Sequence, residues 1–314
     1  MSPLDEAAGR KLGGGSKQRA AAASCRLLRE NHAVVDFHGR FAWYELMTTD
    51  VPGAKAFYTK VIGWAAWDAP APGSPYTVAA AGNAAVGGLM ALPEQARNFG
   101  ARPGWIGYVA VDDVDAAAER VERLGGVLHV PPTDVPNISR FAVFADPQAA
   151  SLALFKRQNP GRREPVEPGT PGRVGWHELL AADLEPALAF YSALFDWQKA
   201  DADVGEGGTY QLFSAGGEII GGLLTKPPTM PTPFWLYYFN VGDIDAAAGR
   251  VKAAGGEVSF GPLELPGGSW LAQCIDPQGV VFALEGTRRR SPVGYFERIG
   301  PRDPLDPRSR RWSW

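Results

Sequence analysis

A glutamate follows a tryptophan by two positions in two segments of the chain that lie 133 residues apart. The segments run from Trp43 to Leu46 and from Trp176 to Leu179. In a strand, side chains two positions apart point to the same face, so each Glu would share a face with its Trp. Burial on an apolar face raises the pKa of a carboxylate toward values useful for proton transfer. Glu45 and Glu178 are therefore the candidate catalytic residues, acting as general acids or bases.

The same residues also have a structural interpretation. A buried Glu could bond backbone amides or an Arg where two structural units meet, and its presence twice suits a role that the fold needs twice. Trp43 and Trp176 could stack on a flat aromatic or sugar-bearing ligand, or they could only fill space. The sequence leaves these alternatives open.

The two Trp-x-Glu-Leu segments belong to a longer internal repeat. Eight of sixteen residues match between 43–58 and 176–191, and ten of sixteen match between 111–126 and 241–256 at an offset of 130. Asp-Pro-Gln at 146–148 recurs at 276–278. The chain is therefore a tandem duplication of two similar halves.

Each half is predicted to contain two strand-helix units. In the first half, a strand over 43–49 leads to Asp50 as the cap of a helix with Pro52 in its first turn. A second strand over 105–111 leads to a helix capped by Asp113, and short strands follow over 127–130, 141–145 and 151–156. The second half repeats this order, which gives four βαβββ units and an α+β fold.

Composition and charge set the boundaries of the chain's organisation. The 314 residues suit two domains, and 45% hydrophobic residues suffice for ordinary cores. We expect five segments: a flexible leader (1–40), domain 1 (41–157), a linker (158–173), domain 2 (174–286) and a basic C-terminal tail (287–314).

The predicted partners follow from charge and apolar runs. The two ends together carry a charge of +8, which leaves −11 for residues 41–286 and argues against a nucleic-acid-binding face. No apolar run approaches a membrane span or a signal peptide. Two cysteines exclude a disulfide scaffold. We expect a cytoplasmic protein that binds a small molecule, without nucleic-acid or membrane partners.

The order of these motifs resembles the vicinal oxygen chelate superfamily, which includes glyoxalase I, extradiol dioxygenases and bleomycin-resistance proteins. A strand that ends in Asp, a helix that carries Phe-Tyr, then Val-Asp-Asp-Val-Asp-Ala-Ala-Ala, Gly-Gly and Asp-Pro-Gln carry the resemblance across residues 41–286. The repeated Trp-x-Glu-Leu opening is similar to the tandem glyoxalase-like branch. The resemblance implies paired βαβββ units that form a cupped mixed sheet with helices outside.

The resemblance also implies where a metal would bind, and this chain departs from the pattern there. Counting from the strand-ending and Asp-Pro aspartates, the ligand positions hold side chains that cannot coordinate a divalent ion: Trp43, Ile106 and Ala153 in the first half, and Trp176, Leu236 and Ala283 in the second. We therefore predict no metal and no other cofactor. His177 adjoins a ligand position, but strand alternation points it to the opposite face, toward the helix.

If the family register holds, alternation also predicts the inner faces of both cups. Besides the two glutamates, the expected ligand-binding residues are Trp43, Met47, Tyr108, Trp176, Tyr238, Asn240 and Glu285. Each cup is then an apolar, aromatic pocket with few polar groups, as in many small-molecule sites. Asn240 and Glu285 make the second cup the more polar one, and it is our choice for the active cup.

Three functions remain in competition. The first is a metal-independent glyoxalase-like protein that binds a small aromatic or carbonyl-bearing metabolite and catalyses isomerase or lyase chemistry by proton transfer. The second is a non-catalytic protein that sequesters a drug or metabolite, as the bleomycin-resistance resemblance implies. The third, a metal-dependent glyoxalase or dioxygenase, is disfavoured by the ligand positions. Because tandem copies can mimic a family dimer, we expect a monomer with pseudo-twofold symmetry or a homodimer.

Overall fold

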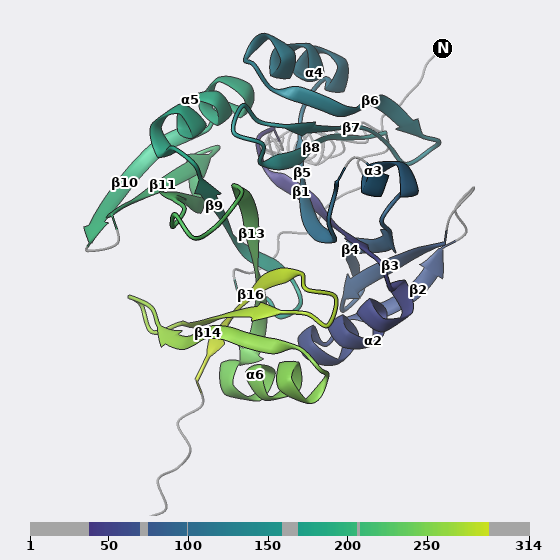
Figure 1. Cartoon of the computed structure of the whole chain (residues 1–314), viewed down its shortest axis with the longest axis vertical. Coiled ribbons are helices and arrows are strands. Elements are labelled where there is room, and N and C mark those ends of the chain that lie inside the picture. The colour runs from purple at the N-terminus through teal and green to yellow at the C-terminus, as the bar shows by residue number, and fades with distance from the viewer. Residues whose placement is uncertain (1–37, 70–74, 99, 159–168, 206–207, 289–314) are drawn as a thin grey trace, which may run out of the picture. The chain divides into compact units, whose positions relative to one another are not determined.

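The computed structural model describes residues 38–69, 75–98, 100–158, 169–205 and 208–288. Most of the predicted leader, linker and basic tail lies outside these residues. The described chain contains two mixed sheets of eight strands each, one from each half of the sequence (Figure 1).

The first sheet is built from two βαβββ units joined side by side. Its central strands, β1 and β5, run antiparallel, and β1 pairs in parallel with β4 while β5 pairs in parallel with β8. In spatial order the strands are β2 (Ala65–Ala69), β3 (Tyr76–Ala81), β4 (Ala84–Ala91), β1 (Phe41–Thr48), β5 (Gly104–Ala110), β8 (Ser151–Arg157), β7 (Ser139–Ala145) and β6 (Val127–Val135).

The second sheet repeats this topology strand for strand. Its central pair is β9 and β13, with parallel partners β12 and β16. In spatial order the strands are β10 (Gln198–Gly205), β11 (Gly208–Ala215), β12 (Glu218–Thr225), β9 (Val174–Ala181), β13 (Phe234–Asp243), β16 (Val281–Thr287), β15 (Trp270–Ile275) and β14 (Glu257–Glu264). The predicted α+β class and the four βαβββ units are confirmed.

The helices begin where the capping residues predict. Asp50 accepts a hydrogen bond from the backbone of Gly53 at 3.0 Å, and Asp113 accepts one from Ala116 at 3.0 Å, which satisfies donors that a helix start leaves unpaired. The described helices are α2 (Val51–Ile62), α3 (Glu94–Asn98), α4 (Val114–Arg123), α5 (Leu184–Phe195) and α6 (Ile244–Ala253).

The largest hydrophobic core lies between the two sheets and contains residues from both halves. Helix α2 of the first half contacts α6 of the second, and α4 contacts α5, so the helices pair across the junction at its two ends (Figure 1). Strands β5 and β13 meet between them. The helix-covered faces of both sheets are therefore turned toward each other.

Two buried triads of hydrogen-bonded side chains link the halves, and each half provides the tyrosine of one triad and the aspartate of the other. In each triad, a helix tyrosine donates to the aspartate of the other half's Asp-Pro-Gln turn and accepts from a tryptophan indole of its own half. The distances are 3.0 Å for Tyr58 to Asp276 and 3.0 Å for Trp105 to Tyr58, then 2.9 Å for Tyr191 to Asp146 and 3.1 Å for Trp235 to Tyr191. The Phe-Tyr and Asp-Pro-Gln motifs thus provide the hydrogen bonds that join the two halves.

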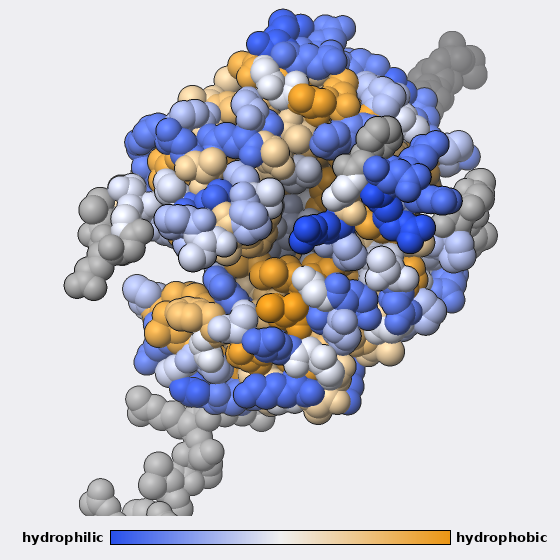
Figure 2. Space-filling model, viewed as in Figure 1, coloured by the Kyte–Doolittle hydropathy of each residue, from blue (hydrophilic) through white to orange (hydrophobic). Residues whose placement is uncertain are grey.

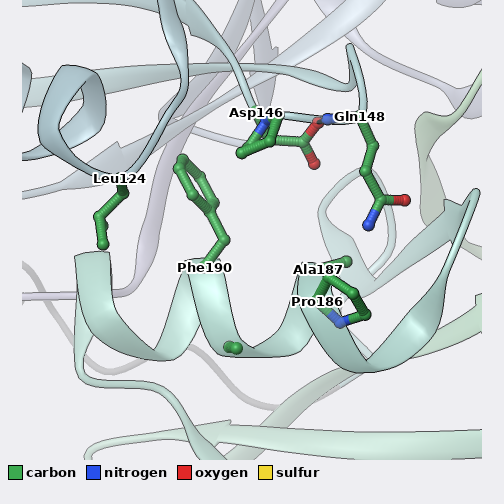
Figure 3. A pocket seen from close by; sticks show the side chains of 8 residues that line it. Leu124, Asp146, Gln148, Pro186, Ala187 and Phe190 are labelled. Atoms are coloured by element: carbon green, nitrogen blue, oxygen red, sulfur yellow. Dashed lines mark hydrogen bonds between the residues drawn. The ribbon is translucent and has the colours of Figure 1, made fainter.

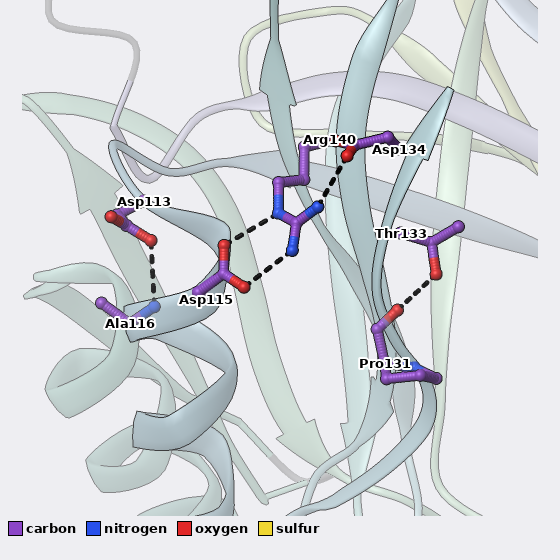
Figure 4. A network of polar contacts seen from close by, with 7 residues as sticks. All are labelled: Asp113, Asp115, Ala116, Pro131, Thr133, Asp134 and Arg140. Atoms are coloured by element: carbon purple, nitrogen blue, oxygen red, sulfur yellow. Dashed lines mark hydrogen bonds and ion pairs between the residues drawn. The ribbon is translucent and has the colours of Figure 1, made fainter. Parts of the chain in front are cut away.

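The two halves differ in the arginine that forms an ion pair with the first turn of a helix, α4 in the first half and α6 in the second. Figure 4 shows Arg140 of β7 between Asp115 in the first turn of α4 and Asp134 of β6, at 2.7 and 3.0 Å. At the position equivalent to Arg140 the second half has Trp270. There Arg288 binds Asp245 at 2.5 Å and lies 3.9 Å from the centre of the Trp270 ring.

No helix among the described residues is long and apolar enough to cross a membrane.

Loss of one junction hydroxyl should destabilise the whole chain. In Tyr58→Phe, the Asp276 carboxylate and the Trp105 indole lose their shared partner, and each unsatisfied buried group costs about 1–3 kcal/mol. We expect the free energy of unfolding, measured by urea denaturation, to fall by about 3 kcal/mol. The matched control is Arg123→Ala, which removes an exposed ion pair with Glu119 and should cost under about 1 kcal/mol. Equal stability of the two variants would contradict the role of the triad.

Candidate functional site

The inner face of each sheet carries a hydrophobic cluster that is separate from the main core. In the first cup, Trp43, Met47 and Phe141 pack against Ile106, Tyr108, Ala153 and Phe155. In the second cup, Trp176, Leu224, Met230, Phe234 and Leu265 pack against Leu180, Leu236, Tyr238, Leu271 and Ala283. The structure therefore brings together the side chains that strand alternation assigned to one face.

The second sheet borders an indentation of the surface in the space-filling view (Figure 2). In Figure 1, strands β10 and β11 at one end of the second sheet lie across from β14 at the other end. Figure 2 shows the outline of the molecule indented at its left side, between these two ends.

In the first cup, the Glu45 carboxylate is held by two tyrosines. The Tyr76 hydroxyl donates to one carboxylate oxygen at 2.9 Å, and the Tyr108 hydroxyl donates to the other at 2.9 Å. The Trp43 indole donates in turn to the Tyr76 hydroxyl at 3.1 Å. The predicted catalytic residue and two predicted ligand-binding residues thus form one network.

The second cup repeats this network. The Tyr210 hydroxyl donates to Glu178 at 3.0 Å, the Trp176 indole donates to Tyr210 at 2.8 Å, and Tyr238 also hydrogen-bonds to the carboxylate. Gln273 adds a hydrogen bond to the Tyr238 hydroxyl. Both networks therefore share one carboxylate, two phenols and one indole, and the second network adds the Gln273 amide.

Paired glycines leave the space that each distal tyrosine occupies. A Cβ atom at Gly88 would lie 1.9 Å from the Tyr76 hydroxyl, and one at Gly222 would lie 2.4 Å from the Tyr210 ring. Because these glycines pair with Glu45 and Glu178 across the sheet, each ring crosses its neighbouring strand to reach the carboxylate. The glycines are thus a requirement of the network.

Burial dominates the electrostatics of both glutamates. Desolvation raises the pKa of Glu45 and of Glu178, and the tyrosine hydrogen bonds oppose that rise in part. The same burial, with the neighbouring carboxylate charge, raises the pKa of Tyr76 and Tyr210. The phenols therefore stay protonated and act as hydrogen-bond donors to the carboxylates.

The remaining predicted ligand-binding residues lie at different depths. Met47 packs into the first cup, and Asn240 is buried with its amide close to Gly175 at the start of β9. Glu285 is half-buried, two positions beyond Ala283 on the same face of β16, and its charge acts on Tyr210. The geometry leaves the roles of these residues as predictions.

Tyr76 and Tyr210 are the site residues that the sequence interpretation missed. Neither residue stands near a Trp-x-Glu-Leu segment, and alternation along that segment says nothing about the register of β3 or β11. The offset offers a signal, because Tyr76 and Tyr210 stand 134 residues apart, as do Gly88 and Gly222. A tyrosine and a glycine that recur at the same offset therefore identify the second phenol partner of each glutamate.

His177 points away from the cup, as alternation predicts, but it contacts the first half of the chain instead of packing only under its own helix. Its Nδ1 donates to the Ile220 carbonyl at 2.6 Å, so its Nε2 accepts from the Tyr44 hydroxyl at 2.6 Å. The ring stacks on Phe41 with centroids 3.8 Å apart. Burial lowers the pKa of His177 to about 4, which keeps the ring neutral in the junction.

Two other features of the described chain offer no chemistry. Burial raises the pKa of the Cys274 thiol to about 12, so it is a poor nucleophile. A surface pocket lies between the Asp146–Gln148 turn and α5 (Figure 3). Its polar groups are already used, because Gln148 exchanges two hydrogen bonds of 2.8 Å with the Asp183 backbone and Asp146 belongs to the junction.

The fold and the paired cups define a tandem βαβββ protein of the glyoxalase type. A model of the Glyoxalase/Bleomycin resistance protein/Dioxygenase superfamily matches residues 40–153 and 173–284. The chain belongs to this superfamily, and the family resemblance drawn from the sequence is confirmed.

Relatives and solved structures agree with this assignment. The chain is 35% identical over 246 residues to CFP32 of Mycobacterium tuberculosis, a protein with a provisional glyoxylase name, covering 77% of this chain and 92% of that one. It is 34% identical over 270 residues to the anthracycline biosynthesis protein DnrV of Streptomyces peucetius, covering 81% and 96%. A Mn(II)-bound glyoxalase from Novosphingobium aromaticivorans shares the fold, with 18% identity, a TM-score of 0.57 and coverage of 80% and 82%.

The donor set of these cups does not fit the metal that such folds hold. The expected ligand positions carry indole and aliphatic side chains, which line the two cup clusters. Across the part of the chain that the structure describes, no three His, Cys, Asp or Glu side chains gather into a possible metal site. Each inward carboxylate is instead surrounded by phenol donors.

The low pKa of His177 predicts how stability responds to acid. Between pH 6.5, the ordinary pKa of a histidine, and about 4, the unfolded chain binds a proton that the native state does not. Stability from this group is therefore complete above pH 6.5 and falls as the pH drops toward 4, by about 3 kcal/mol.

Replacement of the histidine isolates this contribution from that of the buried carboxylates, whose pKa values are raised by burial. Urea denaturation of wild type and His177→Gln at pH 4, 5, 6 and 7 should show a steeper acid loss in the wild type. Parallel stability curves for the two proteins would contradict the assignment.

Proposed function

We propose that the protein binds a small aromatic or carbonyl-bearing metabolite in a cup without using a metal, and that the inward glutamate moves a proton on it. The observation that carries this proposal is a carboxylate with a raised pKa, on an apolar face, that accepts hydrogen bonds from two phenols. A base in such surroundings is weakly solvated and poised for proton transfer.

The network suits both requirements of an enolisation, which are a base that removes the proton and a hydrogen-bond donor for the developing oxyanion. As Glu178 takes a proton from a carbon next to a ligand carbonyl, the bonding electrons move toward the carbonyl oxygen. The protonated carboxyl is a weaker hydrogen-bond acceptor, so Tyr210 or Tyr238 can turn its hydrogen toward the developing oxyanion. Return of the proton from Glu178 to another carbon completes an isomerisation with no net change in charge.

The nature of the ligand is supported by the surfaces and by one relative. The rings of Trp176 and Tyr238 offer flat apolar contact on the inner face. The relative DnrV is named for anthracycline biosynthesis, and anthracyclines are flat aromatic molecules with ketone and phenol groups. An aromatic carbonyl compound is the substrate class that suits both observations.

A second candidate, sequestration without chemistry, is favoured by a different observation. The hydrogen bonds that hold Glu45 and Glu178 come from tyrosines of the protein itself, and both halves have them, so the network also satisfies a requirement of the fold. On this account the cups bind and release the ligand unaltered.

Deuterium exchange separates the two candidates. A neutral enolisable aryl ketone such as 1-tetralone would be incubated with the protein in D₂O, and label at the carbon next to the carbonyl would be followed by NMR. Glu178→Gln should lower the exchange rate by about a hundredfold or more, since general-base catalysis contributes roughly 10²–10⁴, while ligand binding measured by calorimetry persists.

The matched control is Glu257→Gln, which alters an exposed glutamate of β14 and should leave the exchange rate unchanged. Glu45→Gln shows whether the first cup takes part. Full exchange in the Glu45→Gln, Glu178→Gln double variant would remove the catalytic proposal, and binding without exchange in wild type would support sequestration.

A further inference from the structure

The two cups differ at the positions where the halves align. At an offset of 130 residues, Phe141 and Phe155 of the first half correspond to Leu271 and Glu285 of the second, and Val143 corresponds to Gln273. The register supports this alignment, since Phe141 pairs with Phe155 and Leu271 pairs with Glu285 across equivalent strands. The second cup has therefore exchanged two aromatic rings for smaller or charged side chains.

In the first cup those rings fill space. The Tyr108 ring centroid lies 6.1 Å from that of Phe141 and 6.1 Å from that of Phe155. Tyr108 and Phe155 are both buried. Aromatic rings of the first half thus pack against one phenol of the first network.

In the second cup, the position equivalent to Phe155 holds the charged residue Glu285. Glu285 stands on the inner face of β16, next to Asn240 in the sheet, and is half-buried. Within the described parts of the chain, its carboxylate makes no hydrogen bond or ion pair, and its charge contributes to the raised pKa of Tyr210. Lys226 follows β12 and lies beside the last residue of β9, at the end of that strand opposite to Glu285. Its ammonium donates to the Met230 carbonyl at 2.5 Å and does not pair with Glu285.

The rim of the second cup is apolar and exposed. Phe260 and Leu263 of β14 are 51% and 47% exposed. They pair in the sheet with Gln273 and Leu271, so they share the inner face with the cup. The equivalent positions of the first half hold Val130 and Thr133, which offer less apolar surface.

We propose that the second cup is the ligand site, and that Glu285 selects ligands with a flat apolar body and a protonated amine. This proposal rests on the function proposed above, since it names a substrate class for the same site. Phe260, Leu263 and Trp176 provide apolar contact for the body, and the Glu285 carboxylate accepts a charge-assisted hydrogen bond from the ammonium. The first cup then supports the second across the junction.

Matched fluorescent probes test the inference without any need for turnover. The probes are 1-pyrenemethylamine and 2-naphthylmethylamine, each with its N-acetyl derivative, which keeps the rings and loses the charge. Titration of the full chain at pH 7 should show about tenfold tighter binding of each amine than of its N-acetyl derivative, the size of a charge-assisted hydrogen bond. Glu285→Gln should abolish that difference and leave binding of the N-acetyl derivatives unchanged.

Two further variants locate the site. Leu271→Phe combined with Glu285→Phe gives the second cup the packing that the first cup already tolerates, and it should abolish binding of all four probes while circular dichroism stays native. Phe155→Gln in the first cup should leave binding unchanged. Equal binding of amines and N-acetyl derivatives by wild type, or an amine preference that survives Glu285→Gln, overturns the inference.

The outcomes also separate this inference from the catalytic proposal. An amine preference that depends on Glu285, together with absent deuterium exchange, supports amine selection and rejects proton transfer. Exchange that depends on Glu178, without any amine preference, does the reverse.

Discussion

Each half of the chain places a carboxylate on an apolar surface, and the geometry of each inner face follows from the need to satisfy it. A buried acid without partners is costly, so two phenols reach Glu45 and two reach Glu178. One phenol of each pair comes from a strand two places away, which requires a glycine on the strand between them. A tryptophan indole then donates a hydrogen bond to the hydroxyl oxygen of that phenol. Tryptophan, glycine and tyrosine are thus parts of one solution to the burial of a charge.

Duplication provides the frame that holds these networks in place. The helix-covered faces meet in one core, and reciprocal tyrosine-to-aspartate hydrogen bonds cross it. This arrangement leaves both inner faces free of the junction, so one cup can change without loss of the fold. The replacement of Phe155 by Glu285 at the equivalent position illustrates that freedom. A chain with two similar cups can therefore keep one for packing and adapt the other for a ligand.

Much of the fold was predictable because the repeat and the strand period are local signals. The Asp50 and Asp113 caps, the βαβββ order and the face shared by Trp43 and Glu45 follow from spacing alone. The partners of the carboxylates did not follow, because Tyr76 and Tyr210 reach them across a neighbouring strand, and such contacts depend on register. The rim was missed for a related reason, since β14 shifts register around Phe260, which breaks the alternation that assigns residues to a face. Domain limits, site roles and oligomeric state remain predictions.

Native mass spectrometry of the purified full chain, paired with elemental analysis, tests the central claim most directly. The claim is that the phenol-bound carboxylates have replaced the metal site of the family in both cups. The account predicts a chain that carries no divalent metal at stoichiometric level and that releases any bound partner as an organic molecule. One zinc, nickel or manganese ion per half, retained after purification, would contradict it and return metal-dependent glyoxalase or dioxygenase chemistry to first place.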